Sequence, residues 1–141
     1  MGAAAASAAM ARAGSFPAAG LEANHGQADS RVKFLYRGGR YDLFLTAGEA
    51  VFASNKSAVR MRLAGANRAA EVQGLDPMPG KSHYLIGSDA AKWWRHIPVY
   101  ARVAYRAVRP GVDLVYYPSQ GQVEYDLILS PGAEPASIEI E

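Results

Sequence analysis

Apolar and polar residues alternate with a period of two along much of the chain from Arg31 onward. In the segment 59–63, the apolar Val59, Met61 and Leu63 alternate with arginines. A period of two is typical of a half-buried antiparallel strand. The same reasoning predicts strands at 31–36, 41–46, 49–53, 59–63, 82–86, 99–108, 112–117, 122–130 and 137–141.

Glycine and proline separate these predicted strands and favour turns between them. The segment from Gly65 to Gly87 is rich in both residues, so we expect it to be mostly loop, followed by one helical turn over 88–93. Short strands with no long helical pattern predict an all-β fold, an antiparallel β-sandwich or open barrel.

The first twenty residues differ from the rest because they are mostly alanine. They are either a disordered or weakly helical tail, or a degenerate secretory signal segment. We therefore divide the chain into an alanine-rich segment at 1–20 and an all-β domain at 21–141.

Composition narrows the partners and cofactors that the domain is expected to have. The formal net charge is +2 and the basic residues are dispersed, so no nucleic-acid partner is predicted. The chain has no cysteine, and its three histidines have no metal-binding spacing, so no metal or cofactor is predicted. The sequence has no apolar stretch long enough for a membrane-spanning helix.

Three carboxylates on the predicted hairpin after Pro110 are the only candidates for catalysis. Asp113, Glu124 and Asp126 could act as acid and base in a glycoside hydrolase if the strand register brings them together. If Tyr117 pairs with Val123, the two aspartates lie on opposite faces, and a one-residue shift places them on the same face. We expect instead that these carboxylates bond arginine or backbone groups. Because common catalytic motifs are absent, we predict that the chain is not an enzyme.

Aromatic residues are dense in the second half of the chain, and some could bind a ligand. Trp93, Trp94 and Tyr100 could stack on sugar rings if they are exposed, as in a carbohydrate-binding module. The alternative is that these rings fill the core of the β domain.

Several sequence blocks resemble a bacterial domain that precedes SBBP-type β-propeller repeats in secreted or cell-surface proteins. The first is Leu21-Glu22-Ala23-Asn24-His25-Gly26-Gln27, which resembles the opening F-E-x-N-x-G-Q of that domain. Further blocks follow in the same order, at 43–51, 61–67, 74–80, 84–93, 97–105, 110–117 and 124–133. The chain departs from the pattern at Leu21, where phenylalanine is usual, and at Trp94, where a small polar residue is usual.

The resemblance implies a non-catalytic module, located outside the bacterial cell or on its surface, that serves adhesion, assembly or presentation of repeats. Its expected partners are downstream β-propeller repeats of the full-length protein and a surface glycan or protein ligand. Asn24 and Gln27 are expected to form a structured turn, and Asp113 and Asp126 to act as structural anchors. Because the family pattern continues beyond Glu141, we expect the domain to be incomplete at its C-terminus, with an unpaired strand edge prone to association.

Overall fold

A computed structural model describes residues 20–38, 41–84, 94–120 and 122–132, and this part of the chain contains strands but no helix. The predicted all-β antiparallel fold is therefore confirmed. The nine strands are β1 (Leu21–Ala23), β2 (Val32–Arg37), β3 (Asp42–Thr46), β4 (Ala50–Ala53), β5 (Ala58–Met61), β6 (Glu71–Tyr84), β7 (Trp94–Arg109), β8 (Val112–Ser119) and β9 (Gln122–Leu129). Nearly all of the predicted tail at 1–20, the turn at 88–93 and the strand at 137–141 lie outside the described residues.

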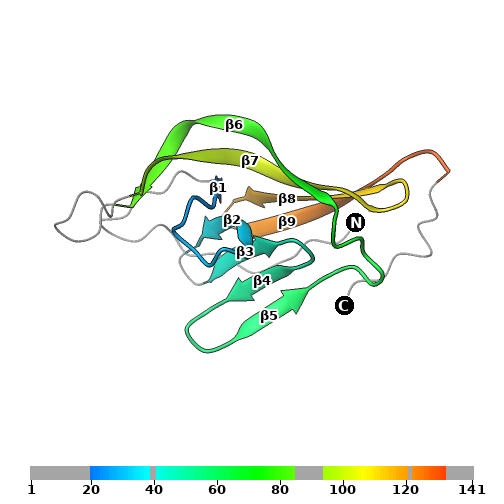
Figure 1. Cartoon of the computed structure of the whole chain (residues 1–141), viewed down its shortest axis with the longest axis horizontal. Coiled ribbons are helices and arrows are strands. Elements are labelled where there is room, and N and C mark those ends of the chain that lie inside the picture. The colour runs from blue at the N-terminus through cyan, green and yellow to red at the C-terminus, as the bar shows by residue number, and fades with distance from the viewer. Residues whose placement is uncertain (1–19, 39–40, 85–93, 121, 133–141) are drawn as a thin grey trace.

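All strand pairs are antiparallel and belong to one sheet, with the order β5-β4-β3-β2-β1-β7-β8-β9 and with β6 paired to β7. The long strand β7 organises this sheet. One edge of β7 pairs with β6, while the other pairs first with β1 and then with β8. The sheet thus has two wings on one edge of β7, a first wing of β1–β5 and a second wing of β8–β9. Figure 1 shows β6 and β7 arching over both wings, and the sheet curls into a half-barrel.

The hydrophobic core lies between the two wings. Leu43 and Leu45 of β3 are fully buried and belong to the same cluster as Val103, Leu114 and Tyr116 from β7 and β8. Alternation explains this arrangement, because each strand directs every second side chain to the core.

Two tyrosines bind the first wing across the core, one to β7 and the other to the second wing. The hydroxyl of Tyr105 donates a hydrogen bond to the carbonyl of Thr46 at the end of β3. Tyr41, next to the start of β3, is hydrogen-bonded to the backbone of Val123 in β9. The first wing is therefore held to β7 and to the second wing by specific bonds as well as by apolar packing.

The predicted loop after Gly65 is wrong over much of its length, because β6 is a strand from Glu71 to Tyr84. The glycine and proline residues of this segment favoured the prediction of a loop, since proline is rare inside a sheet. Yet among the described strands β6 pairs only with β7, and proline is tolerated in such an edge strand. The register shifts between Pro77 and Lys81, and Asp76 has a φ of 55°. The short strand β1 was also missed, because three residues are too few to show a period.

The first wing has a core face and an outer face, and each can be followed as a row of paired residues. The core row runs through Ala23, Phe34, Leu45, Ala50 and Met61. The outer row runs through Glu22, Leu35, Phe44, Val51 and Arg60. The outer row contains apolar residues as well, so the first wing is not simply polar on its far side.

Candidate functional site

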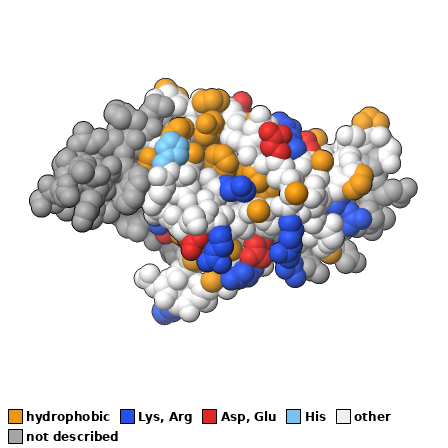
Figure 2. Space-filling model, viewed as in Figure 1, with side chains coloured by type: hydrophobic (Ala, Val, Ile, Leu, Met, Phe, Trp, Pro, Cys, Tyr) orange, Lys and Arg blue, Asp and Glu red, His pale blue; other side chains and the backbone are white. Residues whose placement is uncertain are grey.

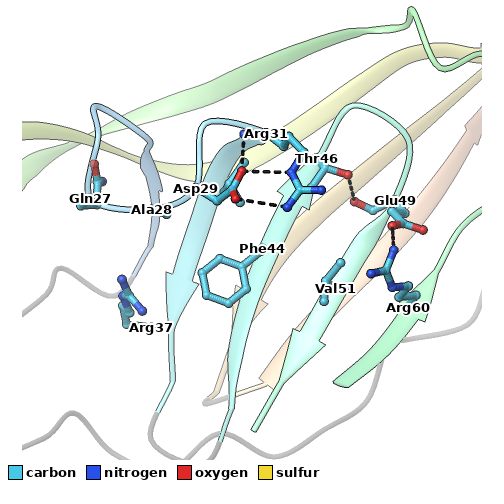
Figure 3. Close-up of a pocket in the computed structure, with 11 residues that line it drawn as sticks. Gln27, Ala28, Asp29, Arg31, Arg37, Phe44, Thr46, Glu49, Val51 and Arg60 are labelled. Atoms are coloured by element: carbon cyan, nitrogen blue, oxygen red, sulfur yellow. Dashed lines mark hydrogen bonds and ion pairs between the residues drawn. The ribbon is translucent and has the colours of Figure 1, made fainter. Parts of the chain in front are cut away.

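The outer face of the first wing carries an open groove of about 460 Å³, which we call the outer groove. Figure 3 shows it lying across β2, β3, β4 and β5, with the segment before β2 forming one wall. Its lining residues are Gln27, Ala28, Asp29, Arg31, Val32, Arg37, Phe44, Thr46, Glu49, Val51 and Arg60.

The floor of the outer groove is apolar. Phe44 and Val51 are paired neighbours on β3 and β4, and both are partly exposed because the neighbouring core residues point to the opposite face. The guanidinium of Arg37 lies 5.8 Å from the centroid of the Phe44 ring, within the range of a cation–π contact. A ligand group placed here would contact an aromatic ring and an aliphatic side chain.

Three arginine–carboxylate pairs surround this floor. Arg31 Nε is 3.1 Å from Asp29 Oδ1, and Arg60 Nη1 is 2.7 Å from Glu49 Oε1.

The third pair, Arg37 Nη1 to Asp42 Oδ2, is 3.0 Å long and is the least exposed of the three. Each guanidinium has five N–H donors, so one carboxylate does not use all of them.

The hydrogen bonds from Arg31 hold the pKa of Asp29 at about 2, well below its ordinary value. Its carboxylate is therefore ionised at neutral pH and acts as a fixed negative group. It is suited to holding an arginine in place and not to transferring a proton. The same side chain also accepts a hydrogen bond from the backbone N–H of Arg31 at 2.9 Å, which closes the turn before β2.

The loop between β1 and β2 forms the wall of the groove and is organised by two amide side chains. Asn24 Nδ2 donates to the carbonyls of Ala28, Asp29 and Val32, at 3.2, 2.8 and 2.8 Å. Its Oδ1 accepts from the backbone N–H groups of Gly26 and Ala28, at 2.9 and 3.2 Å.

Gln27 completes the same loop. Its Nε2 donates to the Ala23 carbonyl at 2.8 Å and to Oε1 of the buried Glu22 at 3.3 Å. Its Oε1 accepts from the His25 backbone at 2.7 Å. Asn24 and Gln27 thus lie in a hydrogen-bonded turn between β1 and β2, and Gln27 also lines the outer groove.

The surface in this view carries both signs of charge. Figure 2 shows Lys or Arg and Asp or Glu side chains gathered next to one another over the lower half of the face. This mixture agrees with the ion pairs around the groove floor. A ligand of one strong charge would therefore find no uniform field at this site.

The three carboxylates considered for catalysis lie on the second wing, away from the outer groove. Tyr117 pairs with Glu124 and Val115 with Asp126, so the register is shifted by one from the pairing of Tyr117 with Val123. All three carboxylates consequently share a face.

Their bonds are structural in character. Asp113 accepts from the Ala107 N–H at 2.8 Å and from Arg106 Nη1 at 3.1 Å, so both of its oxygens are engaged. Ala107 has a φ of 50°, and Asp113 thus holds an irregular point of β7. Asp126 is exposed and accepts from the Tyr117 hydroxyl at 3.2 Å, in place of an arginine or backbone group.

Within the described part of the chain, the three aromatic candidates do not form an exposed strip. Trp93 lies outside the described residues, and Trp94 is paired with Tyr84 in the β6–β7 ribbon. The ring of Tyr100 is half-buried and packs edge-on against Phe34, with centroids 5.8 Å apart. It also lies against Gly74, where a Cβ would come within 2.6 Å of the ring.

Within the described part of the chain, no group of three His, Asp or Glu side chains could hold a metal ion. A search of the same residues finds no helix long and apolar enough to span a membrane.

The outer groove was not anticipated from the sequence. The signal was present in Phe44 and Val51, which are apolar but fall in the opposite phase to the core residues of their strands. Sequence alternation alone could not show that the loop between β1 and β2 would form a wall beside these residues of β3 and β4. It also could not show that three arginines would surround the floor.

Comparison with known proteins identifies a family over most of the chain. A family model described as a domain of unknown function, DUF7948, matches residues 21–141. No curated protein and no solved structure shows a significant match. The matched range coincides with the all-β domain, and the chain therefore belongs to the DUF7948 family.

Proposed function

We propose that this domain is a non-catalytic binding module of a bacterial secreted or cell-surface repeat protein, and that its outer groove holds a segment of that protein's β-propeller repeats. The observation that carries the proposal is the outer groove itself, with an apolar floor of Phe44 and Val51 inside three arginine–carboxylate pairs. Such a site can hold a polypeptide segment by apolar contact and orient it by charge.

The partner is supported by the sequence resemblance to domains that precede SBBP-type repeats. A segment tethered in the same chain binds at a high effective concentration, so a modest apolar site can keep it docked. The mixed charges around the groove also fit a polypeptide, which carries both signs, better than they fit a polyanion.

A non-catalytic role is supported by how the described carboxylates are used. Asp29, Asp42 and Glu49 at the groove each bind an arginine, and Asp113 has both oxygens engaged by Arg106 and a backbone amide. A general acid or base needs a carboxyl that can exchange protons near neutral pH. The pKa of Asp29 at about 2 is unsuited to that task.

Hydrogen exchange in the full-length protein tests this proposal. We expect backbone amides of residues 42–61 to exchange at least tenfold more slowly in the full-length protein than in the 141-residue chain, because docked repeats cover β3–β5. Phe44→Ser should remove that difference by taking the aromatic ring from the groove floor. Measuring the variant in both chains separates lost docking from loosening of β3 itself.

Ile128→Ser is the matched control, since Ile128 is a partly exposed apolar residue on the outer side of the second wing. It should leave the exchange difference at 42–61 intact. Equal exchange of these amides in the short and full-length chains would overturn the docking proposal, as would a full-length protein without propeller repeats.

The proposed location is tested separately by treating intact cells with a protease that cannot enter them. Cleavage of the domain on intact cells, or its recovery from the culture medium, is the expected result. Full protection until the cells are lysed would contradict an extracellular or surface location.

A further inference from the structure

A second hollow lies at one end of the first wing, close to the turn between β3 and β4 and to the connection between β5 and β6. Its volume is about 240 Å³, and its lining residues are Gly48, Arg62, Leu63, Gly65, Ala66 and Arg68. We call it the arginine hollow. Among the described residues, its lining includes two guanidinium side chains and no carboxylate, which sets it apart from the outer groove.

Arg68 is exceptional among the arginines whose side chains the structure describes. Arg31, Arg37, Arg60, Arg102 and Arg106 each bind a carboxylate, and Arg109 Nη1 donates to the Ala64 carbonyl at 3.1 Å. Arg62 also has an interaction of its own. Only Arg68, within that set, has no hydrogen bond or ion pair to a described residue, and it is exposed in the hollow.

The backbone around the hollow is shaped by two glycines. A Cβ at Gly48 would lie 3.3 Å from Cγ of Arg68, so the glycine leaves room for the arginine stem. Gly65 has a φ of +68° in the turn closed by the bond from Ala66 N to the Leu63 carbonyl, 3.2 Å long. A Cβ at Gly65 would lie 3.4 Å from Nη1 of Arg109, so a third guanidinium borders this turn.

Guanidinium groups that share a hollow repel one another, and an anion placed between them reduces that cost. A planar guanidinium matches the paired oxygens of phosphate and sulfate groups and can bind them through two parallel hydrogen bonds. Each guanidinium carries five N–H donors, so Arg68 can offer two of them side by side to one oxyanion.

We propose that the arginine hollow binds a tetrahedral oxyanion, a phosphate or sulfate group, either as the inorganic ion or carried on a larger molecule. Arg68 supplies the principal hydrogen bonds, and Arg62 adds positive charge. This site is separate from the outer groove, and it does not depend on the docking of repeats.

Two-dimensional NMR of the 141-residue chain tests the proposal with sodium sulfate, sodium phosphate and sodium chloride at equal ionic strength. We expect sulfate and phosphate to shift the amide resonances of Gly48, Gly65 and Ala66 in a saturable manner, and chloride to leave them nearly unchanged. Localised shifts are needed because sulfate stabilises folded proteins in general by exclusion from their surface.

Arg68→Gln should weaken sulfate binding about tenfold or more, the loss expected for one charge-assisted contact. Arg68→Lys keeps the charge but loses the planar donor pair, so it should bind with intermediate affinity. Arg102→Gln removes an exposed arginine elsewhere, paired with Asp76, and should bind sulfate as the parent chain does. Unchanged affinity in Arg68→Gln, or equal shifts with chloride, would overturn the proposal.

The source of the anion is distinguished by a third titration with a heparin-derived sulfated tetrasaccharide. Tighter binding of the tetrasaccharide than of sulfate, lost in Arg68→Gln, indicates a group carried on a sugar. Equal or weaker binding indicates a site for the free ion. Loss of both interactions in Arg68→Gln supports the proposal in either case.

Discussion

The side chain of Asn24 makes five hydrogen bonds to the backbone of a loop that the sequence alone marks only by resemblance. The three carbonyl groups that accept from its Nδ2 and the two N–H groups that donate to its Oδ1 all lie within eight residues of Asn24 in the sequence. An amide is the side chain that can both donate and accept in this way, because it carries two N–H donors and a carbonyl oxygen. Asn24 thus makes most of the side-chain bonds that hold the wall of the outer groove, and Gln27 completes them.

Asn24→Ala is expected to lower the free energy of unfolding by about 2–3 kcal/mol, since several partly buried backbone groups lose their partner. Urea denaturation followed by tryptophan fluorescence measures this change. Asn55→Ala, at an exposed position in the turn between β4 and β5, is the control and should change the value by less than about 0.5 kcal/mol. Equal effects of the two substitutions would contradict this role for Asn24.

Tyr105 gives the stability a dependence on alkaline pH. Burial raises the pKa of its phenol far above the ordinary value, so the folded protein keeps the group neutral while the unfolded chain ionises near pH 10. Stability is therefore complete below pH 10 and falls as pH rises above it, by about 1.4 kcal/mol at pH 11 for one such group.

Tyr105→Phe should be less stable at pH 8, because the bond to the Thr46 carbonyl is lost, yet should lose less stability between pH 8 and pH 11. Urea denaturation at the two pH values measures both effects. The same fall with pH in the variant and the parent chain would show that Tyr105 does not contribute to the alkaline loss.

At the scale of elements, alternation predicts a strand well where one side of it is buried and fails where the strand is irregular. The predicted strands at 41–46 and 112–117 correspond closely to β3 and β8. Most of β6 was missed, apart from the end that overlaps the predicted strand at 82–86, because Gly74, Pro77 and Pro79 interrupt any period. These residues are acceptable because β6 lies at the edge of the described sheet. A single sequence does not show which strand will be at an edge.

Gly74 makes this edge strand possible in a second way, because the Tyr100 ring occupies the space where a side chain would be. Gly74→Ala should destabilise the domain by about 1–3 kcal/mol through overpacking. In the Tyr100→Ala background the same substitution should cost much less, and a double-mutant cycle of unfolding free energies measures the coupling. Additive effects would mean that the two residues do not share that space.

At the scale of the whole molecule, the fold class was predictable, but the arrangement of the wings and the groove was not. The period of two indicates which residues are buried without indicating which strands are neighbours. The outer groove depends on the loop at 24–31, on β5 and on ion pairs such as that of Arg60 in β5 with Glu49, which lies just before β4. The aromatic ligand site predicted from Tyr100 overlooked its packing partner, Phe34, which is distant in sequence.

The attachment of the first wing to β7 also sets the order in which the molecule can form. Leu21 in β1 pairs with Tyr100 in β7. The first strand therefore cannot complete its pairing until a strand nearly eighty residues later has been synthesised. During synthesis, β1–β5 can pair locally, but β7, the sheet neighbour of β1, and β8, which completes the core, are still missing. Closure of this long loop is slow compared with hairpin formation. The emerging chain therefore passes through a stage in which its apolar face is uncovered, and a chaperone that shields such faces would find its target there.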